Sequence, residues 1–255
     1  KPKKIFLGDG NAFGLKTEKL YEILDLIAYY FPECEGINMD ATVTSILHKS
    51  QEELEMLARK KVKHLYIGIE SGLDDVLKFM KKDHDLAQAY QAIDRLHEAG
   101  LIYDAHIMTG VAGKGRGMEN AEALAQFLNR TNPAHVVNFS MFLHKEVPLY
   151  QDIRQGTFVP ADELETIREE YHLIERIAPE KAGANILYDG FHDFIHVRVR
   201  GHLPGDKEKM LAKLNGIIQE YEGKEPVYSF VQGECPDLEY CDDGKAVWDM
   251  DRKTS

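Results

Sequence analysis

The segment HLYIGIES, residues His64–Ser71, decides how this chain of 255 residues folds. It is apolar almost throughout, which is expected of a β-strand that is covered on both faces. A helix-like segment precedes it at Gln51–Lys61, where Ser50 and Glu53 form the pattern of an N-terminal capping box, and another follows at Leu73–Lys81. A buried strand between two helices is typical of parallel α/β sheets, in which a helix joins each strand to the next.

The same alternation of strands and helices continues toward both ends of the chain. Further strands are predicted at Ile5–Gly8, Gly36–Thr42, Ile102–Thr109, Val136–Leu143, Ala184–Tyr188, His196–Val199 and Pro226–Phe230. Further helices are predicted at Thr17–Phe31, Leu86–Ala99, Met118–Arg130, Ala161–Ile177 and Lys207–Tyr221. Repeated strand–helix units indicate an α/β fold with parallel strands, and they leave a barrel and an open doubly wound sheet as alternatives.

Composition and charge narrow the classes of partner. The net charge of −12 argues against a nucleic-acid groove as the main surface, and it suits small molecules or locally basic proteins as partners. No apolar run is long enough to span a bilayer, which argues against a membrane-spanning protein. The odd set Cys34, Cys235 and Cys241 offers no paired framework, and it favours a reducing, cytoplasmic setting.

Glycines and polar side chains gather where the predicted strands end. The residues at these ends are Gly8-Asp9-Gly10-Asn11, Glu70-Ser71, Gly110 and Asn138. The C-terminal ends of parallel strands meet at one edge of a sheet, so we expect these residues to lie close together. Glycine lets the backbone approach a ligand closely, while carboxylates and amides bind amino and hydroxyl groups. The sequence therefore predicts a binding face at this edge.

The chain resembles the radical S-adenosylmethionine superfamily in two longer motifs, GIESGLDDVLKFMKKDHD (Gly68–Asp85) and AIDRLHEAG (Ala92–Gly100). Its Gly8–Asn11 segment is similar to the glycine–glycine–glutamate strand end of that family. Two further segments, HIMTGVAGKGRG and VVNFSMFLHKEVPLYQDI, are similar to the fifth and sixth strands of the family. The likeness implies a partial (β/α)6 TIM-like barrel of parallel strands over residues 1–222, followed by a C-terminal extension over residues 223–255.

The resemblance also implies which residues bind S-adenosylmethionine. The methionyl amino group would meet Gly8, Asp9, Gly10 and Asn11, and a carboxylate is a suitable partner for an ammonium group. The ribose hydroxyls would face Glu70 and Ser71. The adenine would be bordered by Gly110 and by the backbone near Asn138 and Phe139, and the methionyl carboxylate would be reached by Arg116.

Members of this family bind a [4Fe-4S] cluster through a Cys-x3-Cys-x2-Cys loop after the first strand, and these 255 residues contain no such loop. We therefore expect the first strand and the cluster loop to lie upstream of Lys1. Ile5–Gly8 would then stand at an open edge of the sheet or pair with a second chain. Cys235 and Cys241 are too few for an auxiliary cluster with four protein ligands.

The function implied by the resemblance is radical chemistry. With its cluster reduced by a flavodoxin or ferredoxin, such an enzyme cleaves S-adenosylmethionine to a 5′-deoxyadenosyl radical, which abstracts hydrogen from a substrate that the sequence does not identify. No catalytic acid or base and no metal ligand is assigned within the chain.

Two other functions stay open. One is a metal-dependent barrel hydrolase, because His192 and His196 have the spacing of two metal ligands on a helix and His106 with Glu70 could complete a site. Against it, the alternation of valine and arginine after His196 favours an extended strand. The other is a non-catalytic barrel that keeps the fold alone.

Overall fold

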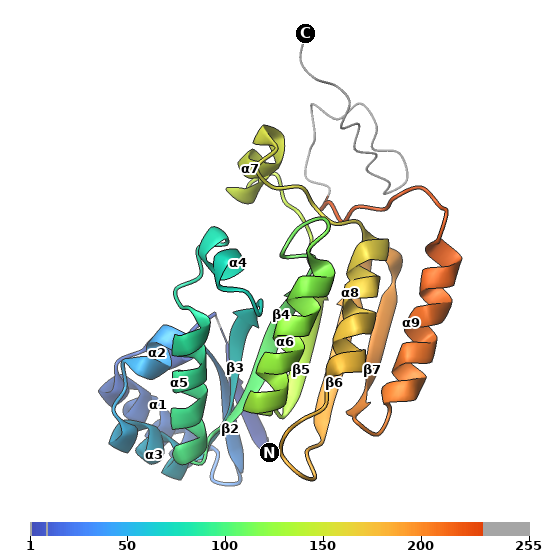
Figure 1. The fold of residues 1–255 in the computed structure, drawn as a ribbon. Helices are drawn as coiled ribbons and strands as arrows, with labels where there is room; N and C mark the ends of the chain where they lie inside the picture. Colours follow the sequence, from blue (N-terminus) through green and yellow to red (C-terminus); the bar gives the residue numbers. More distant parts are fainter. Residues whose placement is uncertain (1, 9, 232–255) are drawn as a thin grey trace.

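The computed structural model describes residues 2–8 and 10–231 (Figure 1). Within these residues, seven strands form one sheet in the order β1-β2-β3-β4-β5-β6-β7. The strands are β1 (Lys4–Leu7), β2 (Gly36–Ala41), β3 (Val62–Glu70), β4 (Ile102–Thr109), β5 (His135–Ser140), β6 (Ile186–His192) and β7 (Val197–Leu203). The predicted α/β fold with a mostly parallel sheet is confirmed. The sheet is not closed, because β1 pairs with β2 alone and stands at the expected open edge.

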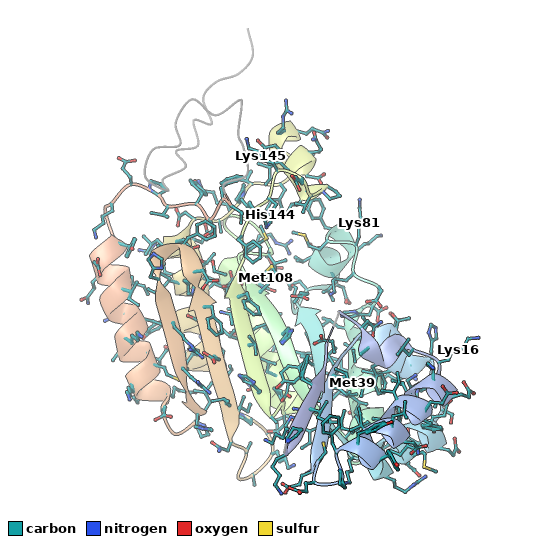
Figure 2. The ribbon with its side chains drawn as sticks, turned by 180° about the vertical axis from the view of Figure 1, so that it is seen from behind. Lys16, Met39, Lys81, Met108, His144 and Lys145 are labelled. Atoms are coloured by element: carbon teal, nitrogen blue, oxygen red, sulfur yellow. The ribbon has the colours of Figure 1, made fainter. Side chains whose placement is uncertain are left out.

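Helices cover one face of this sheet. The helices are α1 (Thr17–Tyr30), α2 (Val43–Leu47), α3 (Gln51–Arg59), α4 (Asp74–Phe79), α5 (Leu86–Glu98), α6 (Gly117–Thr131), α7 (Leu149–Gln155), α8 (Glu163–Arg176) and α9 (Lys207–Tyr221). Figure 1 shows α5, α6, α8 and α9 on the near side of the strands, and the view from behind shows β4 to β7 without a helix in front of them (Figure 2). We call the covered side the helix face and the opposite side the inner face.

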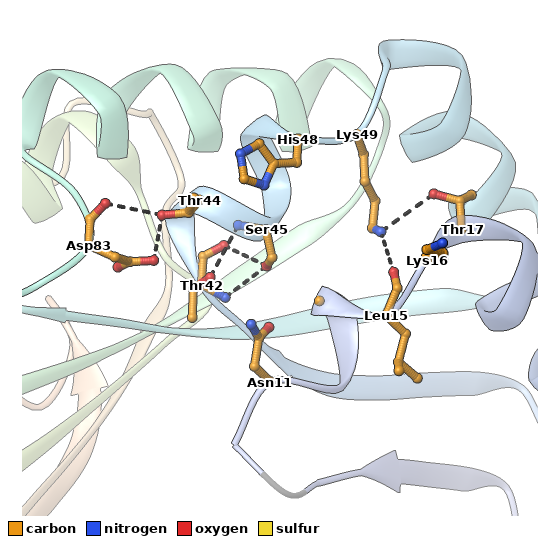
Figure 3. A pocket seen from close by; sticks show the side chains of 11 residues that line it. Asn11, Leu15, Lys16, Thr17, Thr42, Thr44, Ser45, His48, Lys49 and Asp83 are labelled. Carbon is orange, nitrogen blue, oxygen red and sulfur yellow. Dashed lines mark hydrogen bonds between the residues drawn. The ribbon is translucent and has the colours of Figure 1, made fainter.

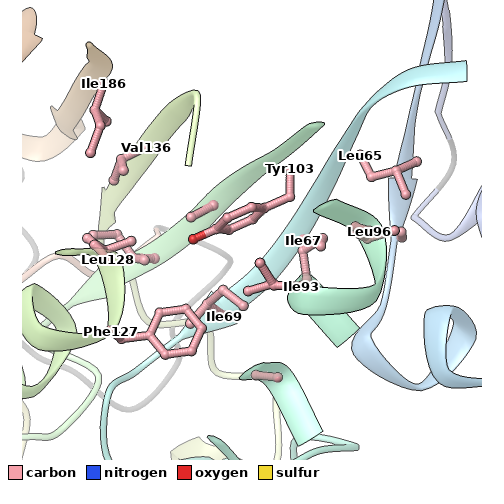
Figure 4. Close-up of a cluster of buried hydrophobic side chains, with 14 of the residues drawn as sticks. Leu65, Ile67, Ile69, Ile93, Leu96, Tyr103, Phe127, Leu128, Val136 and Ile186 are labelled. Carbon is pink, nitrogen blue, oxygen red and sulfur yellow. The ribbon is translucent and has the colours of Figure 1, made fainter. Parts of the chain in front are cut away.

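The hydrophobic core lies between the sheet and the helix face. Leu65, Ile67 and Ile69 of β3 are fully buried and belong to one cluster with Ile93 of α5 (Figure 4). The alternate residue Tyr66 is only half-buried, because successive side chains of a strand point to opposite faces. The expectation that this segment is covered on both faces is therefore wrong. Its apolar appearance comes from a core face and an aromatic inner face.

The last strands differ from the prediction. β7 pairs antiparallel with β6, and it extends to Leu203. The two strands are joined by a short 3-10 turn, η2 (Asp193–Ile195), whereas a parallel partner needs a crossover of a dozen or more residues. The segment Pro226–Phe230 does not form a strand; Phe230 makes an isolated bridge to Leu143.

The domain boundary placed after residue 222 stays a prediction, and α9 ends just before it at Tyr221. Most of the extension lies outside the described residues. No helix in the described part of the chain combines the length and apolar character that a membrane crossing needs.

A glycine at the end of β3 lets α6 approach the sheet. A Cβ atom at Gly72 would overlap the backbone of Ala123 and Leu124. We expect Gly72→Ala to lower the free energy of unfolding by about 1–3 kcal/mol, as overpacking does in a core. In the matched control Gly216→Ala, the exposed helical site has open space, so we expect a gain of up to about 1 kcal/mol. Urea unfolding measures both, and equal effects at the two sites would contradict the packing argument.

Candidate functional site

The C-terminal ends of the parallel strands meet at one edge of the sheet, as the sequence predicts. The register places Met108 opposite Phe139 and Thr109 opposite Ser140, and Glu70 lies beside Ile107 at nearly the same level. The ends of β1 and β2 continue this edge. The predicted residues at the ends of β3, β4 and β5 therefore lie along one rim of the sheet.

Glu70 has an unusual backbone conformation. Its φ of 63° lies in the left-handed region that residues other than glycine seldom adopt, and the pairing of β3 with β4 shifts between Gly68 and Glu70. Its carboxylate forms an ion pair of 3.3 Å with Lys82. Such strain at a strand end turns the side chain in a direction that a regular strand would not give, and it is commonest at functional sites.

Gly10 leaves space at the end of β1. Its φ is 84°, and no atom lies within 4 Å of the position that a Cβ atom would take. Gly8 is exposed beside it, while Asp9 lies outside the described residues. A glycine is needed here for the backbone conformation, and the space around it is free for a ligand.

A polar cavity of about 420 Å³ adjoins this segment (Figure 3). It is lined by Asn11, Gly14, Leu15, Lys16, Thr17, Thr42, Thr44, Ser45, His48, Lys49 and Asp83. Lys49 is buried, and its Nζ donates to the carbonyl oxygen of Leu15 at 2.9 Å. Burial lowers the pKa of the Lys49 ammonium. The hydroxyl, amide and amino groups on this wall can hydrogen-bond a polar ligand.

Sequence reasoning missed most of the residues that line this cavity. The available signal is the capping box of α2, in which Thr42 and Ser45 hydrogen-bond each other's backbone, but the helix has only five residues and shows no periodicity. Asn11 is the one residue of the cavity wall that the sequence also places at the cofactor site.

Ser71 and Asn138 point to the helix face. The Ser71 hydroxyl donates to Asn120 Oδ1 at 2.6 Å, and Asn138 Nδ2 donates to Glu170 at 3.0 Å. Asn138 Oδ1 also accepts the N–H of Thr109 at 3.1 Å. Both side chains are fully buried. Their predicted contacts with the cofactor stay predictions, and those of Asn138 would involve its backbone.

A buried carboxylate joins two of the strand ends. Glu169 of α8 accepts the N–H of Gly110 at 2.8 Å with one oxygen and Asn120 Nδ2 at 2.7 Å with the other. Asn120 in turn accepts the Ser71 hydroxyl and the N–H of Gly72 at 3.2 Å. Burial raises the pKa of Glu169 to about 8, although these two hydrogen bonds lower it. The ends of β3 and β4 are thus held by one chain of hydrogen bonds.

A second buried network lies behind β5 and β6. His192 Nδ1 is 2.9 Å from Glu163, and its Nε2 is 3.1 Å from Glu170. Burial lowers the pKa of His192, but the hydrogen bonds to both carboxylates raise it to about 10, so both ring nitrogens donate at neutral pH. A Cβ atom at Gly190 would overlap the Glu170 carboxylate, which explains the glycine in the middle of β6.

Arg116 lies on the loop after β4 and is already paired. Its guanidinium contacts Asp75 at 2.7 Å and Glu119 at 2.8 Å. It lines a second cavity of about 360 Å³ together with Phe79 and Phe158. This cavity contains none of the other predicted cofactor residues. The predicted contact of Arg116 with a methionyl carboxylate stays a prediction.

The residues of the rival hydrolase site are not brought together. His192 is buried on the helix face, His196 is exposed beyond the end of β6, and His106 and Glu70 belong to the inner face. In residues 2–8 and 10–231, no group of three or more histidine, cysteine, aspartate or glutamate side chains is arranged to hold a metal.

The described cysteine does not fit a cluster ligand. Cys34 is buried, and its Sγ lies 3.4 Å from the Gly36 carbonyl oxygen. Cys235 and Cys241 lie outside the described residues. The part of the chain that the structure describes therefore provides no set of ligands for a [4Fe-4S] cluster.

Comparison with known proteins decides the family. The Radical SAM superfamily matches residues 1–128, which is half of the chain. The chain belongs to the radical SAM superfamily. It is 24% identical over 119 residues to the tRNA uridine(34) acetyltransferase of Methanocaldococcus infernus, covering 46% of this chain and 22% of that protein. It is 22% identical over 174 residues to the heme chaperone HemW of Bacillus subtilis, covering 68% of this chain and 45% of that protein.

A solved structure shows the same fold. The archaeal Elp3 of Methanocaldococcus infernus with an N-terminal deletion superposes with a TM-score of 0.61 at 16% identity, over 86% of this chain and 54% of that chain. The radical SAM chain described here spans less than two thirds of each of these proteins. The resemblance drawn from the strand-end motifs is thus confirmed at the level of family and fold.

The buried networks predict a pH dependence of stability. Glu169 and His192 both have pKa values above their ordinary values of 4.5 and 6.5, so these two groups bind more protons in the folded chain than in the unfolded chain. Each contribution to stability is fully present below the ordinary pKa and is lost as the pH rises through the folded value, about 8 for Glu169 and about 10 for His192. Burial lowers the pKa values of His97, His106 and His135, which adds stability as the pH rises toward 6.5 and opposes this fall. We therefore expect the free energy of unfolding, measured with urea, to fall between about pH 7 and pH 10.

Glu169→Gln separates the two groups. Between pH 4.5 and 6.5 only Glu169 of this pair changes its contribution, so the slope of the variant should be more positive than the wild-type slope in that range, and the decline above about pH 7 should remain. Glu175→Gln, on the exposed side of the same helix, should leave the profile unchanged. A wild-type slope between pH 4.5 and 6.5 in Glu169→Gln would contradict the assignment.

Proposed function

We propose that the rim formed by the ends of β1, β3, β4 and β5 binds S-adenosylmethionine for radical chemistry. The observation that carries the proposal is the left-handed backbone of Glu70 at the end of β3, on the rim that Gly10, Gly110 and Phe139 share. A carboxylate turned out of the regular strand direction suits the ribose hydroxyls. The open space beside Gly10 suits the methionyl end.

The chemistry that the cofactors supply is generation of a 5′-deoxyadenosyl radical by a reduced [4Fe-4S] cluster. The residues of this chain would orient S-adenosylmethionine and keep water from the reactive centre. Glu169 and Asn120 would hold the strand ends that contact the nucleoside. The cluster ligands would come from outside the described residues, with a flavodoxin or ferredoxin as reductant.

The substrate is not assigned by the relatives. One is named a tRNA acetyltransferase and another a heme chaperone, and these names describe different activities. Hydrogen abstraction from a small molecule fits the acidic surface better than nucleic-acid binding does, since the net charge is −12. The odd number of cysteines supports a reducing, cytoplasmic location as part of the same proposal.

Gly10 provides the sharpest test of the binding site. We expect Gly10→Val in the full-length, cluster-loaded protein to weaken S-adenosylmethionine binding by roughly tenfold or more, because a side chain would occupy the methionyl space. Gly100→Val is a matched control, because Gly100 also has a positive φ and no atom near its Cβ position but precedes β4 at the opposite edge. Calorimetry measures both affinities. Equal affinities in the two variants would rule out the placement.

The cysteine content leads to a second prediction. A polypeptide limited to these 255 residues should not produce 5′-deoxyadenosine after anaerobic reconstitution with iron and sulfide. Its three cysteines do not have the Cys-x3-Cys-x2-Cys spacing that leaves one iron open for S-adenosylmethionine. Chromatography of the reaction mixture with dithionite as reductant is the measurement. Detection of 5′-deoxyadenosine above a cluster-free control would show that other ligands hold the cluster.

A further inference from the structure

A row of aromatic rings crosses the inner face of the sheet. Its members, in order across the strands, are Phe6, Tyr66, His106, Phe139 and Phe191, which we call the aromatic band. Neighbouring ring centroids are 5.4, 5.5, 6.1 and 5.6 Å apart along this order. Such distances are those of interacting aromatic pairs, so the five rings form one continuous surface.

The band is not part of the hydrophobic core. Phe6 is 52% exposed, and the other four rings are half-buried. The core residues of the same strands point to the helix face, so the band lies on the side that Figure 2 shows without helices over β4 to β7. A contiguous aromatic surface left open on a folded domain commonly marks a binding site.

The two titratable rings of the band are uncharged at neutral pH. Burial lowers the pKa of His106, so its imidazole is neutral. Burial and the nearby Asp104 carboxylate raise the pKa of Tyr66, so its hydroxyl stays protonated. The band therefore offers neutral ring faces, which stack on flat unsaturated groups.

One end of the band carries excess positive charge. The guanidinium of Arg198 lies 4.8 Å from the ring centroid of Phe191. Arg198 donates to Asp189 through two hydrogen bonds of 2.7 and 2.6 Å, and Arg200 approaches the same carboxylate at 3.6 Å. One carboxylate thus serves two guanidinium groups. Both arginine side chains are more than half exposed, at 52% and 55%, so they can bind a further anion.

The band also reaches the proposed cofactor rim. Phe139 lies opposite Met108 in the register, about one residue from the level of Glu70. Phe139 is one residue nearer the C-terminal edge than Glu70, so a molecule that stacks on Phe139 and Phe191 would lie beside the nucleoside at the rim. The reactive carbon of a cofactor-derived radical and the bound molecule would share one face of the sheet.

We propose that the aromatic band binds the substrate of this enzyme, and that the substrate is a planar unsaturated small molecule bearing a carboxylate or a phosphate. Its flat part stacks on Phe139 and Phe191, and its anionic group binds Arg198 and Arg200. This inference rests on the proposed function for its location, but binding to the band is measurable without radical chemistry.

The test uses four small probes with the full-length protein and calorimetry. The probes are 2-naphthoate, 2-naphthyl phosphate, the neutral 2-naphthylmethanol, and the non-planar decalin-2-carboxylate. We expect the two naphthyl anions to bind roughly tenfold more tightly than each of the other two. Comparison of the naphthoate with the phosphate decides which anion the site prefers. Absence of binding of both anions at millimolar concentration would overturn the proposal.

Variants place the binding on the band. Phe191→Leu should weaken binding of 2-naphthoate by roughly tenfold, and Arg198→Gln should weaken it similarly while leaving 2-naphthylmethanol unchanged. Arg200→Gln is a second charge variant that keeps both hydrogen bonds between Arg198 and Asp189. The matched controls are Phe31→Leu and Arg168→Gln. Phe31 follows the end of α1 and is 40% exposed, and Arg168 of α8 is paired with Glu222. Equal effects in variants and controls would overturn the assignment.

Affinity for S-adenosylmethionine is measured in the same variants to separate the two proposals. If the cofactor does not bind while 2-naphthoate binds in a manner dependent on Phe191 and Arg198, the proposed function fails and the band stands as a ligand site. If the cofactor binds and the affinity for 2-naphthoate does not depend on Phe191 or Arg198, the proposed function stands and the substrate class is wrong.

Discussion

The buried carboxylate of Glu169 is the contact on which the geometry of the rim depends. The residues just after β3 and β4 have backbone N–H groups that donate to side chains and not to a neighbouring strand. Glu169 accepts the N–H of Gly110 directly. It also accepts a hydrogen bond from Asn120 Nδ2, and Asn120 in turn accepts the N–H of Gly72 at the end of β3. Each oxygen of Glu169 faces an N–H donor, so the ionised form satisfies both donors, whereas a glutamine could satisfy only one of them. A helix packed behind the sheet therefore determines the shape of the rim in front of it.

The adjacent network around His192 has a different role. Glu163 and Glu170 lie on the same helix, and the imidazole between them joins that helix to the end of β6. Glu163 also accepts from Ser140 and from Ser229, which brings the segment after α9 to the end of β5. Removing one member of such a buried group is strongly destabilising, because it leaves an uncompensated charge. The rim is thus supported by a rigid polar layer rather than by apolar packing alone.

Much of this fold was readable from the sequence, and the failures have physical reasons. The bounds of β4 and α9 were predicted without error, because a glycine and a clear periodicity mark them. The direction of β7 could not be read, since alternation with a period of two is the same in both directions. The burial of Glu169 and Glu170 could not be predicted from the sequence either. Their space is created by glycines in other elements, and a glutamate pair on a helix ordinarily faces water.

The reversed direction of β7 has a consequence for the length of the turn that precedes it. Arg198 and Arg200 face inward only because the turn at Asp193–Ile195 sets the register of the hairpin. Inserting one residue in this turn would exchange the two faces of β7 and bring Val197 and Val199 inward instead. The same insertion would turn Arg198 and Arg200 toward the core, where Val199 is fully buried. Burial of two guanidinium groups without partners is costly, so the length of this turn holds the two arginines on the inner face.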